Sequence, residues 1–144
     1  MKRAGVAAVL MAATIVVGGC SAPAVSATSG PTAAAAPAAG SSLSPSDFAA
    51  AAKLPDTVLL DVRTPSEFAA GHITGAVNLD VQSATVPEQA ATLDPAKNYA
   101  IYCHSGNRSK VAMTAMGQSG FSLLFDLAGG ITAWQSSGGQ VVTG

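Results

Sequence analysis

The pattern of apolar and polar positions changes along the chain, and from residue 43 onward it alternates between two kinds of segment. Short continuous apolar runs predict buried strands near residues 58–62, 76–79, 99–102 and 122–127. Between them, helical spacing and helix-start residues predict helices near 44–53, 66–70, 86–93, 108–119 and 131–137. Strands that alternate with helices indicate an α/β fold, a three-layer sandwich whose central, mostly parallel sheet is flanked by helices.

The first 42 residues follow a different pattern. A basic start, Met1-Lys2-Arg3, precedes an apolar run from Ala4 to Val17, which is shorter than the roughly 20 residues that a membrane-spanning helix needs. We therefore expect a signal peptide over residues 1–19. Residues 20–42 are almost wholly Ala, Pro, Ser, Thr and Gly, a composition that predicts a disordered linker. One domain remains, over residues 43–144.

The tetrad Val17-Gly18-Gly19-Cys20 resembles the lipobox of bacterial lipoproteins. The resemblance implies that cleavage before Cys20 leaves a lipid-modified N-terminus, which would anchor the domain outside the cytoplasm on the bacterial cell membrane. The alternative is an ordinary secretory signal that is cut near residues 22–27 and releases a soluble protein.

The net charge of the chain and its few potential metal ligands exclude some kinds of partner. The formal charge is −1, and without Lys2 and Arg3 five basic and eight acidic residues remain. A weakly acidic domain without a stripe of Lys and Arg indicates no nucleic-acid partner. The two histidines and two cysteines lack the spacing of a metal site, so we expect neither a metal nor another cofactor.

The candidate chemistry lies where the apolar run 99–102 meets the helical pattern that begins at Arg108. Cys103 stands at this junction, and Ser105 and Gly106 follow where the backbone must bend tightly. Such a loop can turn several N–H groups inward, and the helix adds the positive end of its dipole. Both effects favour a thiolate, so Cys103 is a candidate nucleophile.

This interpretation requires that the sulfur of Cys103 can be reached from solvent and that neighbouring amides face it. The alternative is an inert cysteine buried in the core. A disulfide with Cys20 would require that the leader is retained. If Cys20 carries lipid instead, Cys103 is the only thiol of the mature chain, and an unpaired cysteine in an exported protein indicates a reactive site.

Three segments resemble the single-domain rhodanese (sulfurtransferase) family, in the family's order. They are residues 60–78 with Leu60-Asp61-Val62-Arg63, residues 103–109 (Cys-His-Ser-Gly-Asn-Arg-Ser), and residues 127–134 (Leu-Ala-Gly-Gly-Ile-Thr-Ala-Trp). The resemblance implies that the Cys103 thiolate attacks a sulfane sulfur, as in thiosulfate, and holds it as a persulfide. A thiol or cyanide then removes the sulfur. The resemblance thus implies a small molecule or a protein as sulfur donor, and a thiol or cyanide as acceptor.

The resemblance also implies that the loop after the cysteine binds the substrate, through His104, Ser105, Gly106, Asn107, Arg108 and Ser109. Arg108 is the best candidate for an anionic donor, because its guanidinium is a fixed cation with forked donors. His104 departs from the family, in which arginine is frequent at that position. We hypothesise that donor binding strengthens as His104 becomes protonated. The alternative is a solvent-facing loop residue without a task.

Four further residues are expected to support the structure: Asp61, Arg63, His72 and Trp134. Arg63 and Glu67 are spaced for an ion pair across one helical turn.

Two other functions remain open. A cysteine phosphatase or arsenate reductase has a similar loop, but with five residues between cysteine and arginine, whereas four separate Cys103 from Arg108. The shorter loop should suit a single sulfur better than a phosphate. A noncatalytic interaction, sulfur-carrier or redox-sensing module would use the same fold without turnover.

Overall fold

The computed structural model describes residues 25–144, and the expected signal peptide and Cys20 lie outside that range. The elements, in chain order, are β1 (Ser41–Leu43), α1 (Pro45–Ala51), β2 (Thr57–Asp61), α2 (Pro65–Ala70), β3 (His72–Ile73), β4 (Val77–Asn78), α3 (Val86–Ala90), β5 (Asn98–Tyr102), α4 (Asn107–Gln118), β6 (Leu124–Leu127), α5 (Gly130–Ser136) and β7 (Val141–Val142).

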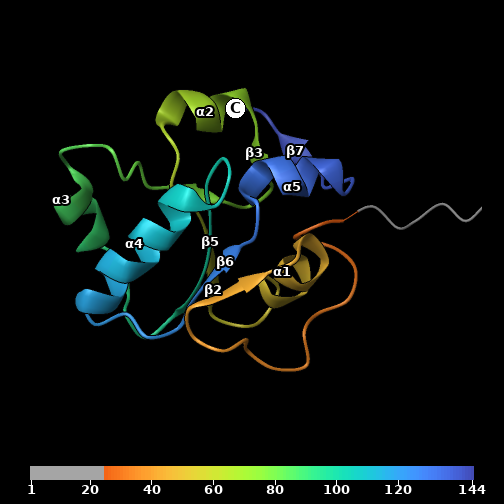
Figure 1. Ribbon diagram of the computed structural model, residues 1–144, viewed down its shortest axis with the longest axis horizontal. Helices are drawn as coiled ribbons and strands as arrows, with labels where there is room; N and C mark the ends of the chain where they lie inside the picture. Colours follow the sequence, from red (N-terminus) through yellow and green to blue (C-terminus); the bar gives the residue numbers. More distant parts are fainter. Residues whose placement is uncertain (1–24) are drawn as a thin grey trace, which may run out of the picture.

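Five strands form the central sheet in the order β1-β6-β5-β2-β4, and every neighbouring pair in it is parallel. A separate antiparallel pair joins β3 to β7. Figure 1 shows α3 and α4 on one side of the sheet, α1 and α5 on the other, and α2 beyond one end of the strands. The predicted α/β fold with a mostly parallel sheet between helices is confirmed.

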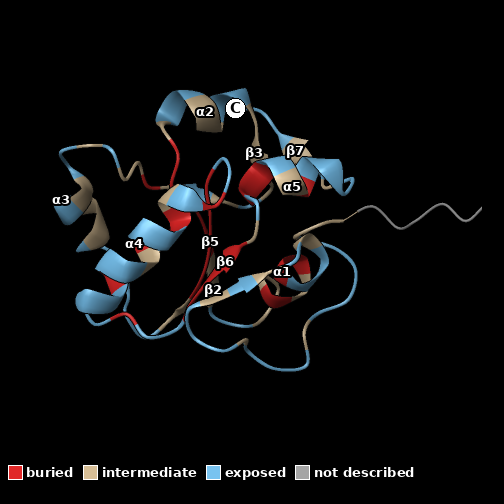
Figure 2. Ribbon diagram, viewed as in Figure 1, coloured by how far each residue is buried: buried red, intermediate tan, exposed pale blue. Residues whose placement is uncertain are grey.

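Each face of the sheet has its own apolar core. Figure 2 shows buried residues along the central strands of the sheet. On the side of α1 and α5, the ring of Phe48 meets Phe125 and Trp134 edge-on, with centroid separations of 6.0 and 6.5 Å. On the other side, Ala112 and Met116 of α4 belong to the cluster that contains Leu60 of β2 and Tyr99 and Ile101 of β5. Burial of both faces explains why the strands read as continuous apolar runs.

Local signals set the ends of several helices. Ser44 caps α1, which begins with a proline, and Thr64 caps α2 through a capping box with Glu67. Gly106 and Gly129 adopt left-handed conformations directly before α4 and α5. A side chain is disfavoured in that conformation, so glycine fits both positions.

The expected linker over residues 20–42 is not wholly separate from the domain. Ser41 and Ser42 belong to β1, which pairs with β6. Earlier in the segment, the N–H of Ala33 donates to the carbonyl of Ala50 at 3.0 Å, and Lys53 Nζ donates to the carbonyl of Ser26 at 3.0 Å. Because the side chains of this segment are small, it shows no periodic pattern of apolar residues. The same small side chains let its backbone lie against the sheet and α1. The short strands β3 and β7 were also not predicted.

Residues 25–144 contain neither a long apolar helix nor a cluster of metal ligands. None of the helices in this range has the length and apolar character needed to cross a bilayer. The same range holds no group of three or more His, Cys, Asp or Glu side chains placed to bind a metal ion.

Candidate functional site

Cys103 follows the last residue of β5, at the carboxyl end of the central strand, and the loop after it leads into α4. The N–H of Gly106 donates to Cys103 Sγ at 3.1 Å, and Gly106 has a φ of 97°. The thiol lies 3.8 Å from the hydroxyl oxygen of Ser109, in the first turn of α4. The loop therefore curls back so that one main-chain amide and the start of the helix face the sulfur.

The start of α5 holds the other side of this loop. The N–H of Ile131 donates to the carbonyl of Cys103 at 2.9 Å, and the N–H and hydroxyl of Thr132 donate to the carbonyl of His104 at 3.3 and 3.0 Å. Gly130 makes this approach possible, because a Cβ there would lie 2.5 Å from both carbonyl oxygens. Two helix N-termini thus meet at the Cys103 loop.

A buried carboxylate lies behind the loop. Asp126, on β6, is 0% exposed, and it accepts hydrogen bonds from the hydroxyls of Ser109, at 2.7 Å, and Ser42. Ser109 is itself buried and lies within 3.0 Å of the carbonyl of Gly106. These contacts join the start of α4 to β6 and β1. Both acceptor contacts of Asp126 are therefore to neutral hydroxyls.

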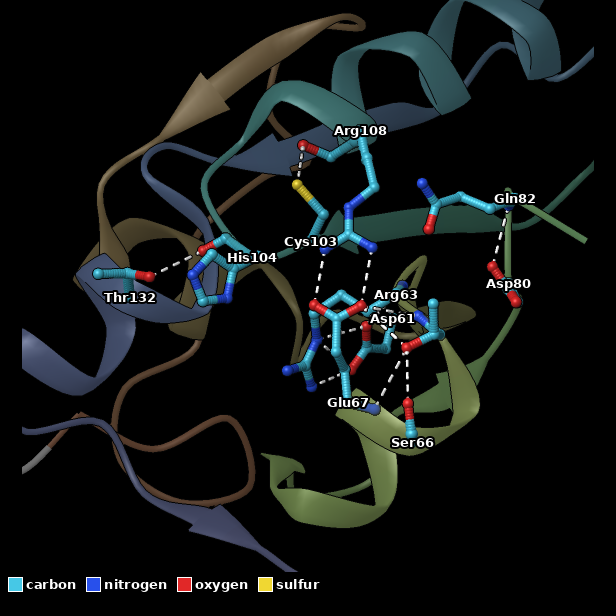
Figure 3. Close-up of polar contacts among 12 residues, drawn as sticks. Asp61, Arg63, Ser66, Glu67, Asp80, Gln82, Cys103, His104, Arg108 and Thr132 are labelled. Atoms are coloured by element: carbon cyan, nitrogen blue, oxygen red, sulfur yellow. Dashed lines mark hydrogen bonds and ion pairs between the residues drawn. The ribbon is translucent and has the colours of Figure 1, made fainter.

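Arg108 reaches from α4 to Glu67 on α2 (Figure 3). Its two terminal nitrogens donate to the two carboxylate oxygens of Glu67 at 2.8 and 2.7 Å, which is the bidentate geometry of a strong ion pair. Arg108 lowers the pKa of Glu67 to about 2, and hydrogen bonds from Thr64 add to the effect. Arg108 remains the candidate for binding an anionic donor, but in this structure both of its terminal nitrogens are already engaged by Glu67.

The depressed pKa of Glu67 predicts a loss of stability in acid. Its contribution is present above the ordinary pKa of 4.5 and is lost as the pH falls through about 2. We expect the difference in unfolding free energy between wild type and Glu67→Gln to be largest above about pH 5 and to shrink below pH 3. Urea unfolding at several pH values measures it, and a difference that stays constant from pH 6 to pH 2 would contradict the prediction.

Arg63 pairs with Asp61 instead of Glu67, so the expected ion pair across one helical turn is wrong. Three hydrogen bonds of 2.6 to 3.1 Å join the guanidinium to the carboxylate of Asp61, and another of 2.7 Å reaches the carbonyl of Gly71. Burial alone would lower the pKa of Arg63, but the hydrogen bond and charge of Asp61 outweigh it and raise that pKa. This pair ties the end of β2 to the end of α2.

The other two supporting residues have structural contacts. His72 Nδ1 lies 3.0 Å from the carbonyl of Phe68, and the two rings stack with centroids 3.7 Å apart. Trp134 is fully buried, and its Nε1–H donates to the carbonyl of Gln140 at 2.9 Å.

Cys103 is shielded from solvent. Its exposed fraction is 1%, and it packs in the same apolar cluster as Ile101 and Ala112. Of the two requirements for a nucleophile, the facing amide is met by Gly106, and access to solvent is not met in this conformation. Sulfur transfer at Cys103 therefore requires a conformation in which the sulfur is more exposed than it is here.

Beside the loop lies an open depression of about 160 Å³. Its wall includes Arg63, Glu67, His104, Ile131 and Gln135, and Cys103 is not part of it. His104, Ser105 and Asn107 are exposed on the loop, whereas Gly106 and Ser109 are buried. The loop residues expected to bind substrate are therefore of two kinds, some facing solvent and some supporting the sulfur.

Comparison with known proteins decides the family. A profile described as the rhodanese-like domain matches residues 44–137. The chain belongs to the rhodanese family. The matched range extends from the cap of α1 to the end of α5 and contains every residue of the Cys103 loop.

Among the relatives of this rhodanese-like domain is a protein named sulfurtransferase from Allochromatium vinosum. It is 36% identical over 87 residues, which cover 60% of this chain and 79% of the relative. The thiosulfate sulfurtransferase GlpE of Pseudomonas entomophila is 38% identical over 80 residues, 56% of this chain and 72% of the relative. A solved rhodanese-related protein from Thermoplasma volcanium is 32% identical with a TM-score of 0.64, covering 72% of this chain and 99% of the other.

Sequence reasoning about this rhodanese-like domain missed three contributors to the site. They are Glu67 as the partner of Arg108, Asp126 with Ser42 behind the loop, and the N-terminus of α5 in front of it. The Gly129-Gly130 pair was a usable signal for the last of these, since it lies just before an expected helix. Asp126 also carried a signal, because a lone acidic residue inside an apolar strand must find a polar partner.

Proposed function

We propose that this rhodanese-like domain is a sulfurtransferase that moves a sulfane sulfur, as from thiosulfate, to a thiophilic acceptor through a persulfide on Cys103. The hydrogen bond from the N–H of Gly106 to Cys103 Sγ, at 3.1 Å, carries the proposal. The N–H of Gly106 and the start of α4 face the sulfur, where they can stabilise the negative charge of a persulfide. The relatives that are named sulfurtransferases support a role in sulfur transfer at the level of the family.

In the first half of the reaction, the Cys103 thiolate attacks the outer sulfur of thiosulfate. A sulfur–sulfur bond forms on Cys103, and the bond in thiosulfate breaks with its electron pair leaving as sulfite. In the second half, cyanide or a thiolate attacks the outer sulfur of the persulfide, and the Cys103 thiolate is restored. No oxidant, reductant or metal enters either step.

Mass spectrometry tests the proposal. After thiosulfate treatment, the fragment that contains Cys103 should gain one sulfur atom, and cyanide should remove it. A fragment that gains no sulfur from thiosulfate or from a sulfane sulfur donor with a single negative charge would overturn the proposal. A persulfide that forms but that neither cyanide nor thiols discharge would instead indicate a sulfur carrier.

A further inference from the structure

The cations of the described chain are unevenly placed. Residues 25–144 contain two arginines, Arg63 and Arg108, and both lie beside the Cys103 loop. The lysines of this range lie elsewhere: Lys53 binds carbonyls of residues 26 and 29, Lys97 precedes β5, and Lys110 lines a cavity with Gly40 and Ser42. An anionic donor at the loop therefore depends on the two arginines for permanent positive charge.

Both arginines already have carboxylate partners. Arg63 is held by Asp61, and Arg108 is held by Glu67 through two hydrogen bonds of 2.7 and 2.8 Å. Asp126 adds a third carboxylate, which contacts neutral hydroxyls behind the loop. Two guanidiniums and three carboxylates thus lie around one thiol, so the site presents no surplus positive charge to a dianion.

Arg108 and Glu67 are the partly exposed members of this set. The side chains of Arg63 and Asp61 are 5% and 0% exposed, whereas those of Arg108 and Glu67 are 25% and 31% exposed. The Arg108–Glu67 pair is therefore the one that an incoming donor can meet. Thr64 also holds Glu67, because its N–H and its hydroxyl donate to the Glu67 carboxylate at 3.1 and 3.0 Å. Glu67 is therefore fixed to the start of α2 independently of Arg108.

We propose that Glu67 sets the donor preference of this site, by occupying Arg108 and so favouring sulfane sulfur donors with a single negative charge over the thiosulfate dianion. The inference rests on the proposed function, since it concerns the donor of the same Cys103 site. Glu67 acts through Arg108 and is a positioning residue.

Thiosulfate and methanethiosulfonate have similar shapes and react in the same way, but they differ in charge. Methanethiosulfonate replaces one anionic oxygen of thiosulfate by a methyl group, so it carries one negative charge instead of two. With either donor the Cys103 thiolate takes the outer sulfur as a persulfide. The old sulfur–sulfur bond breaks with its electron pair leaving as methanesulfinate or as sulfite. The measured quantity is the ratio of kcat/KM for thiosulfate to kcat/KM for methanethiosulfonate.

Glu67→Gln is the test variant, because glutamine preserves both the size of the side chain and the capping box with Thr64. We expect the thiosulfate-to-methanethiosulfonate ratio to rise about tenfold, as expected when one charge-assisted contact becomes available to the dianion. Glu88→Gln, which removes an exposed carboxylate on α3, makes the same change in net charge and should leave the ratio unchanged. Both kcat/KM values are measured on the same preparation. A smaller folded fraction therefore lowers both equally and leaves their ratio unchanged.

The double variant shows whether Glu67 acts through Arg108. Adding Glu67→Gln to an Arg108→Gln protein should leave the ratio unchanged. A ratio that is the same in wild type and Glu67→Gln, while both donors load Cys103, would overturn the inference and leave the proposed function standing. If neither donor adds sulfur to Cys103 in the wild type, the proposed function fails, and the inference fails with it.

Discussion

Replacing Cys103 by alanine should lower sulfur transfer from thiosulfate to cyanide by at least about a thousandfold, because the covalent route is lost with the nucleophile. Neighbouring groups cannot substitute for it. The hydroxyl of Ser109 is engaged with Asp126, and the amide of Gly106 is a donor. Initial rates of thiocyanate formation measure the effect.

The comparison with Cys103→Ser separates chemistry from folding. A hydroxyl at this buried position must be desolvated, at a cost of about 1–2 kcal/mol unless it finds a full set of partners. Alanine leaves only a small cavity. Both variants should be inactive at a temperature where circular dichroism shows each of them folded. Transfer at the wild-type rate in folded Cys103→Ala would show that the reaction does not pass through this residue.

Gly130→Ala is expected to damage both stability and activity. The new Cβ would lie 2.5 Å from the carbonyl oxygens of Cys103 and His104, closer than real Cβ atoms come, and the contacts are backbone atoms that cannot rotate away. Gly130 also has a φ of +61°, which disfavours any side chain. We expect a loss of about 3 kcal/mol or more in unfolding free energy, from the backbone conformation and the overpacking together.

The same change should lower kcat/KM by about a hundredfold in the protein that remains folded, because a shift of about 1 Å in the Cys103 loop misplaces the nucleophile. Gly138→Ala is the matched control. Gly138 also has a positive φ, +81°, but a Cβ there meets nothing within 4 Å. It should cost about 1–2 kcal/mol and leave kcat/KM unchanged. Equal effects of the two substitutions on both quantities would contradict the role given to Gly130.

Some features of the site followed from local signals. The apolar run before Cys103 ended in a turn with glycine, and a helical pattern followed, so the position of the thiol between β5 and α4 was predictable. The caps of α1 and α2 were also readable, since a capping residue bonds to amides two or three positions away. In each case the residues that interact are close in the chain.

Other features depended on segments that are distant in sequence. Arg63 lies four residues before Glu67, which favoured a pair between them, but Asp61 took Arg63 and left Glu67 to Arg108, 41 positions further on. Charged side chains are compatible with many partners, and only the packing of α2 against the Cys103 loop selected one. Similarly, β1 arises from a low-complexity segment because β6 offers it an edge to pair with.

By itself, the sequence determined the α/β class, the position of Cys103 at the end of the central strand, and the helix that follows it, because each depends on short-range periodicity and backbone preference. The tertiary structure alone decided that Arg108 is occupied by Glu67, that Asp126 and the start of α5 brace the loop, and that Cys103 is buried. These depend on which distant surfaces meet, since pairing and burial are properties of the packed chain.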